Sequence, residues 1–197
     1  VMGFCAPRYL PAVVAATISS LTSPGFAGQA DPPRPFEMRA VRTAKPPSID
    51  GVVQDDEWAG AARATGFVQF EPRRGEPATG STVAFVTYDA GHLYVAFRCV
   101  DAEPLTAQLT QRDADLFGDD AVALLLDTHN DRQTAYYFIT NPLGTQADGR
   151  ISDDGRQSDG AWDAPWRSAS HRSAGGWSAE FAIPLTSLKF TSGNDVT

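Results

Sequence analysis

The chain has 197 residues, a net charge of −8 and 42% hydrophobic residues. A nucleic-acid-binding domain needs a basic surface, so this charge argues against that class and against docking on anionic lipid. No run of 18 apolar residues follows residue 30, which excludes a membrane-spanning helix there. Of the two cysteines, Cys5 lies in a segment predicted to be removed, so no internal disulfide is expected. The composition suits one globular domain that binds neutral ligands, or cations held by carboxylates.

Residues 1–30 have the layout of a secretory signal peptide. Arg8 precedes an apolar run over residues 9–21, and small residues surround Ala27 and Ala30. A positive start, a short apolar centre and small residues at a cleavage site define such a signal. We therefore expect cleavage after Ala27 or Ala30 and an exported protein in the periplasm, the outer membrane or the extracellular space. A buried N-terminal helix is the alternative.

Residues 31–45 are predicted to be a linker that includes an edge strand near residues 36–43. Five prolines lie between residues 31 and 49, and proline favours an extended backbone. A tight turn is expected at residues 49–51, followed by a single helical turn that points Trp58 inward. The remaining domain spans residues 46–197.

A β-hairpin is the clearest structural signal. Apolar residues alternate over residues 83–88 and again over residues 93–100, and Gly91 between them permits a turn with positive φ. Further strands are expected at residues 121–126, 134–140, 161–170 and 177–183, with a turn at residues 141–144.

These short strands predict an all-β fold, an antiparallel β-sandwich of jelly-roll or immunoglobulin-like type with seven or eight strands. A β-like stretch begins at the end of the sequence, so we expect a further C-terminal strand to be missing from this fragment. Trp58 and Trp177 are predicted to be core residues. So are the alternating apolar residues, which are Val83, Phe85, Leu93, Val95, Phe97, Val122, Leu124, Phe181 and Ile183.

Several short segments, taken in order, carry a family resemblance. They are residues 47–51 (PSIDG) with Asp56, Glu57 and Trp58; residues 88–97 (YDAGHLYVAF); Asp119, Asp120 and Asp127; residues 138–144 (FITNPLG); and residues 176–184 (GWSAEFAIP). This series resembles the family 9-like carbohydrate-binding domain, a relative of the DOMON sandwiches. It is most similar to the versions found before the β-barrel of large bacterial outer-membrane proteins.

The resemblance implies a non-catalytic sandwich that binds a polysaccharide or oligosaccharide, often with structural calcium, and a following outer-membrane barrel as a partner. Two departures concern the sugar site. Sugar-binding members place a Trp shortly before the acidic pair, where this chain has Leu116 and Phe117. They also have a Glu in the next strand, where this chain has Ala123.

Aromatic residues in polar segments are the candidate ligand-binding residues, because a sugar ring stacks on an aromatic plane while its hydroxyls need fixed polar partners. We expect Phe117, Trp162 and Trp166 to stack on the saccharide, with Arg112 and Asn141 as hydrogen-bonding partners. The alternative is that one or both tryptophans cap the core.

Clustered carboxylates are the candidate metal ligands. The first group, Asp113, Asp115, Asp119 and Asp120, falls within eight residues, and a second group comprises Asp148, Asp153, Asp154, Asp159 and Asp163. Calcium prefers six to eight oxygen ligands, so the first group is a candidate calcium site, and a solvated acidic loop is the alternative. The three histidines are far apart in sequence, which disfavours zinc.

Three functional classes remain open, and no nucleophile motif or phosphate-binding glycine loop favours an enzyme. The first is a saccharide-binding module. The second is an accessory domain on the periplasmic or outer face of an outer-membrane barrel, without sugar affinity. The third is a haem- or metal-binding sandwich, which ranks last because suitable axial His or Met ligands are lacking.

Overall fold

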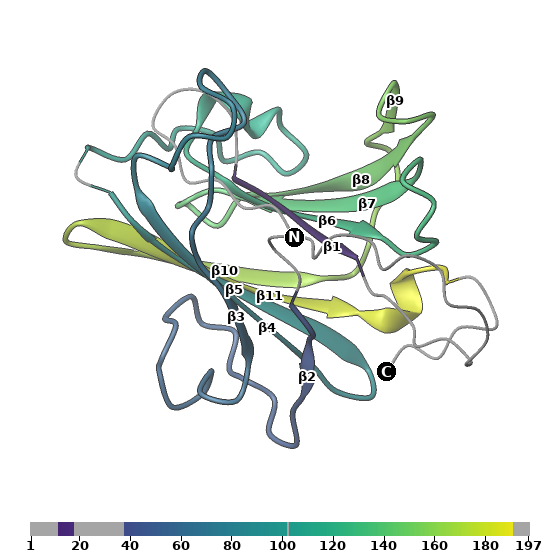
Figure 1. Ribbon diagram of the computed structural model, residues 1–197, viewed down its shortest axis with the longest axis horizontal. Coiled ribbons are helices and arrows are strands. Elements are labelled where there is room, and N and C mark those ends of the chain that lie inside the picture. Colours follow the sequence, from purple (N-terminus) through teal and green to yellow (C-terminus); the bar gives the residue numbers. More distant parts are fainter. Residues whose placement is uncertain (1–11, 18–37, 102, 191–197) are drawn as a thin grey trace, which may run out of the picture.

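The computed structural model describes residues 12–17, 38–101 and 103–190, which form two β-sheets packed face to face (Figure 1). The predicted cleavage sites lie outside these residues, as does the end of the sequence where a further strand was expected. No helix among the described residues is long and apolar enough to cross a membrane. The predicted all-β sandwich is confirmed.

Sheet A contains the order β1-β6-β7-β8-β9. Its strands are β1 (Ala12–Thr17), β6 (Val122–Asp127), β7 (Ala135–Thr140), β8 (Gln146–Ser152) and β9 (Gln157–Asp159). β1 runs parallel to β6, whereas the other pairs are antiparallel. β1 lies inside the predicted signal peptide, so cleavage there would remove one neighbour of β6.

Sheet B contains the order β10-β11-β5-β4-β2, with β3 also paired to β4. Its strands are β2 (Val41–Arg42), β3 (Ala62–Ala64), β4 (Ser81–Tyr88), β5 (His92–Val100), β10 (Arg167–Ser173) and β11 (Gly176–Pro184). The predicted hairpin is β4 and β5. β2 pairs in parallel with β4. The sandwich is therefore not wholly antiparallel, contrary to the prediction. Two short 3₁₀ turns complete the described elements, η1 (Leu116–Gly118) and η2 (Leu185–Ser187).

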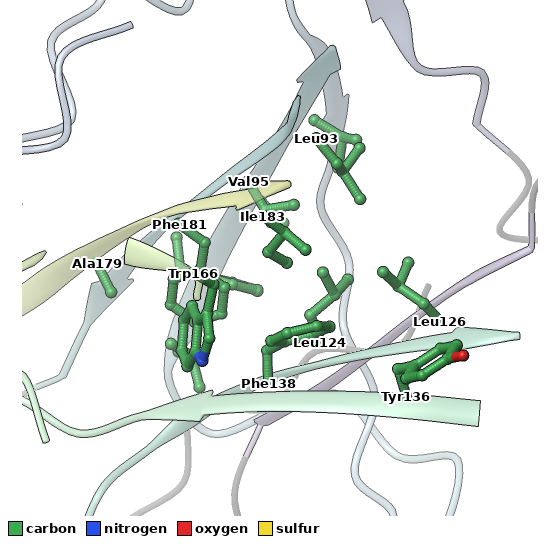
Figure 2. Close-up of a cluster of buried hydrophobic side chains, with 14 of the residues drawn as sticks. Leu93, Val95, Leu124, Leu126, Tyr136, Phe138, Trp166, Ala179, Phe181 and Ile183 are labelled. Atoms are coloured by element: carbon green, nitrogen blue, oxygen red, sulfur yellow. The ribbon is translucent and has the colours of Figure 1, made fainter. Parts of the chain in front are cut away.

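The main core lies between the two sheets. Aromatic rings from both sheets contact Trp166 there. Trp166 enters from the segment before β10, with its ring centroid 5.2 Å from that of Phe138 in sheet A and 5.0 Å from that of Phe181 in sheet B. Figure 2 shows these rings among the aliphatic side chains of both sheets. Burying such rings stabilises a fold by about 3–5 kcal/mol each, judged by truncation to Ala.

A second cluster covers the outer face of sheet B. Trp58 packs against Phe85 at a centroid distance of 6.1 Å, and Val83 is only half-buried beside them. Alternation along β4 therefore sends Val83 and Phe85 outward, while Ala84 and Val86 face the main core. Phe85 and Leu93 are buried as predicted, although in different clusters, whereas Val83 is only half-buried. The burial of Trp58 and Trp177 is confirmed.

A buried carboxylate fixes the N-terminal segment to this outer face. Glu180 accepts hydrogen bonds from the backbone N–H groups of Asp50 and Gly51 and from the indole N–H of Trp58. Gly51 has φ +90°, and a Cβ there would lie 2.6 Å from the carbonyl carbon of Ser170. Only glycine suits this close approach, so the predicted turn at residues 49–51 is a packing site.

Candidate functional site

The Arg112 side chain lies where the β5–β6 loop passes the first half of β8 and hydrogen-bonds to it. It donates from Nη1 to Gln146 Oε1 at 2.6 Å, and from Nη2 to Asp148 Oδ1 at 2.6 Å and to Asp163 Oδ1. β9 bonds only to the second half of β8, residues 150–152, and in the first half the Asp113 N–H donates to the Gln146 carbonyl at 2.9 Å. The guanidinium is therefore held at a fixed position while 38% of its side chain stays exposed.

Asp148 is the buried residue of this network. Its side chain has no exposed surface, and it also accepts from the indole N–H of Trp166 at 3.0 Å and from the Ala164 N–H at 2.8 Å. Burial raises the pKa of the Asp148 carboxyl, and the bonds from Trp166 and Ala164 together with the Arg112 charge offset only part of that effect. Asp148 thus joins the exposed arginine to the core.

Phe117 stands outward on η1, with 55% of its surface exposed. Asp115 caps this short turn by accepting from the Phe117 N–H at 3.2 Å. Leu116 is buried against Ala121 and Ala147 on the outer side of sheet A. Because Leu116 anchors the turn, its neighbour Phe117 is directed to solvent. The predicted exposure of Phe117 is confirmed.

Asn141 is not available to a ligand, so its predicted role as a polar partner is wrong. It has no exposed surface, and its amide donates to Leu109 O and Asp119 Oδ2, both at 2.8 Å. Its side-chain oxygen accepts from the N–H groups of Leu143 and Thr145. Asn141 instead ties the β7–β8 turn to the β5–β6 loop.

The two candidate tryptophans belong to the core to different degrees. Trp166 is 4% exposed, so the expectation that it stacks on a saccharide is wrong. Its neighbours in the sequence are polar, but its own indole N–H donates to the buried Asp148. Trp162 is half-buried, with its ring 4.8 Å from Tyr136. Part of its surface therefore stays open to solvent.

The four candidate calcium ligands do not converge on one point. Asp113 contacts Arg112 Nε at 3.5 Å, and Asp115 caps η1. Asp119 accepts from the backbone N–H groups of Gln108 and Leu109 as well as from Asn141. The Thr106 N–H donates to Asp120. Among residues 38–101 and 103–190, no group of three His, Cys, Asp or Glu side chains is arranged to hold a metal.

The arrangement can accept and donate hydrogen bonds, but its buried carboxylate is not placed for hydrolysis. A glycosidase needs two carboxyl groups facing the scissile bond. Asp148 has no exposed surface and both of its oxygens are bonded internally. What remains accessible is the Arg112 network and the ring of Phe117.

Sequence reasoning did not assign Gln146, Asp148 or Asp163 to the ligand site. Asp148 and Asp163 were recognised only as part of an acidic group. The alternation of Gln146 and Asp148 in β8 was a usable signal, since residues two apart share a face of a strand. A separate hollow of about 580 Å³ between β2 and the β4–β5 turn contains none of the predicted residues.

Comparison with known proteins agrees with this architecture. Two structures of a family 9 carbohydrate-binding module from Caldicellulosiruptor kristjanssonii are similar to the chain. The complex with cellotriose has 18% identity and a TM-score of 0.52, covering 75% of this chain and 67% of that chain. The complex with glucose has 16% identity and a TM-score of 0.51, covering 79% and 71%.

A third similar structure, of a protein from Bacteroides uniformis, has 12% identity and a TM-score of 0.57, covering 79% of this chain and 76% of that chain. No curated protein sequence matches the chain. Residues 49–197 match the carbohydrate family 9 binding domain-like family, whose members are binding domains and not enzymes. Because that match covers most of the chain, and the sandwich agrees with it, this protein belongs to the carbohydrate family 9 binding domain-like family.

Proposed function

We propose that this domain binds a short oligosaccharide without catalysis, through Arg112 and Phe117 of the β5–β6 loop. The observation that carries the proposal is the exposed Phe117 ring on the same loop as the fixed guanidinium of Arg112. The complexes of the Caldicellulosiruptor module with cellotriose and glucose support a saccharide as the ligand class.

Phe117 takes the part that the family resemblance gives to a tryptophan shortly before the acidic pair. Its ring can stack on the C–H face of a pyranose, while the Arg112 network offers hydrogen bonds to hydroxyl groups. Each such bond contributes about 0.5–1.5 kcal/mol net because water competes. A few bonds and one ring correspond to a Kd between about 1 μM and 1 mM.

Titration calorimetry with cellotriose tests this proposal on residues 31–197. We expect Phe117→Ala to weaken binding by about tenfold, the effect of losing about 1.4 kcal/mol of contact energy. Phe70→Ala is the matched control, because Phe70 is 45% exposed in the loop between β3 and β4. Equal effects of the two substitutions would contradict the proposed site, whereas absence of heat at millimolar sugar would favour an accessory barrel domain without sugar affinity.

Export is the second part of the proposal, and it is supported by the signal-like residues 1–30. Mass spectrometry of protein expressed with its own N-terminus should give a chain that begins at Gly28 or Asp31. An intact cytoplasmic chain would contradict export. A following outer-membrane barrel is part of the same proposal, and the gene sequence downstream should then encode alternating strands with aromatic girdles.

Calcium stabilisation remains a prediction of the sequence. A ligand that binds only the folded state at a hundredfold excess over its Kd stabilises it by about 2.7 kcal/mol. A melting temperature measured with calcium and then with a chelator would reveal this as a shift. Asp119→Ala should abolish the shift if the first aspartate group holds the ion, and an unchanged melting temperature would remove calcium from the proposal.

A further inference from the structure

The polar surface around Arg112 carries more negative than positive charge. Three aspartates form ion pairs with this one guanidinium, at 2.6 Å for Asp148 and 3.5 Å for Asp113, with Asp163 also in contact. All ion pairs of these aspartates within the described residues are made to Arg112. One positive charge therefore faces three carboxylates.

Most of the donors of Arg112 are already used inside the protein. Nη2 serves Asp148 and Asp163, Nη1 serves Gln146, and Nε faces Asp113. A guanidinium has five N–H groups, so about one remains for a ligand. Arg112 therefore serves mainly to position its neighbours, and few of its N–H donors are left for a ligand.

The atoms that a ligand meets are therefore carboxylate oxygens. The Asp163 side chain is 70% exposed and the Asp113 side chain is 43% exposed. An ionised carboxylate only accepts hydrogen bonds. Hydroxyl groups can donate to it, and an ammonium group can donate while also neutralising the surplus charge.

We propose that this site prefers amine-bearing saccharides over neutral ones and rejects acidic ones. The inference rests on the proposed saccharide site and decides only which saccharide class suits it. An exposed ion pair gains little in water, so we expect about 3- to 10-fold tighter binding of the amine at low salt. Because salt screens exposed charges, the preference should shrink as ionic strength rises.

Three β-1,4-linked trimers of the same sugar configuration test the proposal by calorimetry at pH 6. They are cellotriose, the fully deacetylated glucosamine trimer and the glucuronic acid trimer. We expect the glucosamine trimer to bind best and the glucuronate trimer to give no heat. Cellotriose should displace the glucosamine trimer, and Phe117→Ala should weaken both, because general attraction to an acidic protein would show neither effect.

Two charge-neutralising variants locate the preference. Asp163→Asn should remove most of the amine preference and weaken binding of the glucosamine trimer more than that of cellotriose, since the side chain loses its charge but keeps its size and one acceptor oxygen. Asp56 is an exposed aspartate before Trp58. Asp56→Asn removes the same charge elsewhere and should change the binding of neither the glucosamine trimer nor cellotriose. Equal affinity for the three trimers, or equal effects of the two variants, overturns the charge preference but not the proposed function. Failure of all three trimers to bind overturns both.

Discussion

Glu180 and Asp148 are two buried carboxylates with similar partners and different surroundings. Each accepts from a tryptophan indole and from the backbone, Glu180 from Trp58 and Asp148 from Trp166. Burial raises the pKa of both. Glu180 lies under the segment at residues 50–58 and forms no ion pair in the described structure, whereas Asp148 forms one with the partly exposed Arg112.

This difference separates a structural anchor from a functional one. Glu180 holds residues 50–58 against sheet B through hydrogen bonds, so its loss should affect folding alone. Asp148 connects the core to an exposed arginine, so its loss should affect both folding and ligand binding. The following substitutions test that distinction.

Truncation of Trp166 should give the largest effect, because it removes a core ring and a hydrogen bond to Asp148 together. We expect Trp166→Ala to lower the free energy of unfolding by about 3–5 kcal/mol. Urea unfolding measures this. Trp162→Ala is the comparison, and its half-buried ring should cost clearly less. A cost for Trp166→Ala within 1 kcal/mol of zero would show that the ring is not in the core.

Glu180→Ala leaves three donors without their acceptor. Burying an unsatisfied donor costs about 1–3 kcal/mol, and water can enter part of the space left by the side chain. We therefore expect a loss of about 2–4 kcal/mol in urea unfolding, with cellotriose affinity unchanged. Glu103→Ala, at an exposed position, serves as the control. If Glu180→Ala bound cellotriose more weakly, the functional distinction between Glu180 and Asp148 would be wrong.

Asp148→Asn should lower stability by about 1–3 kcal/mol, because a charged acceptor of Arg112 and Trp166 becomes neutral. Unlike Glu180→Ala, it should also weaken saccharide binding by several fold, since the guanidinium loses its buried support. Calorimetry on the folded variant checks this. Unchanged affinity would mean that Arg112 is positioned by Asp163 and Gln146 alone.

The pH dependence of stability should be the smallest effect. A carboxyl whose pKa is raised on folding binds its proton more tightly in the folded state. The free energy of unfolding should therefore fall as pH rises from the ordinary value of 4.5 for Glu180 through its raised pKa. Urea unfolding at pH 5 and pH 7 measures the slope, and Glu180→Gln should reduce it. An unchanged slope in Glu180→Gln would show that the pKa of Glu180 is not raised.

The hairpin and most of the core were predictable because alternation along a strand reports burial directly. Leu93, Val95 and Phe97 share a face in β5 and all lie in the main core. β8 was not predicted, because its sequence QADGRIS is mostly polar. Its inward Asp148 is compatible with burial only because Trp166 and Arg112 supply distant partners.

The candidate site was predictable in part. Phe117 and Arg112 lie at the surface as expected, since a polar loop with few apolar anchors keeps them there. Asn141 and Trp166 were misassigned because their neighbours in sequence are polar and turn-forming. Their burial depends on Asp119 and Asp148, which lie 22 and 18 residues away, so no local pattern reports it.

Saccharide binding at the surface of Arg112 and Phe117 is the central claim, and an NMR titration of the isotopically labelled domain with cellotriose tests it most directly. The backbone amide signals of residues 112–118 should shift with one saturable Kd between about 1 μM and 1 mM. Signals of residues 50–58 beside Glu180 should not move. Shifts confined to residues 42–44 and 89–92, around the separate hollow, or no shifts at millimolar sugar, would contradict the claim.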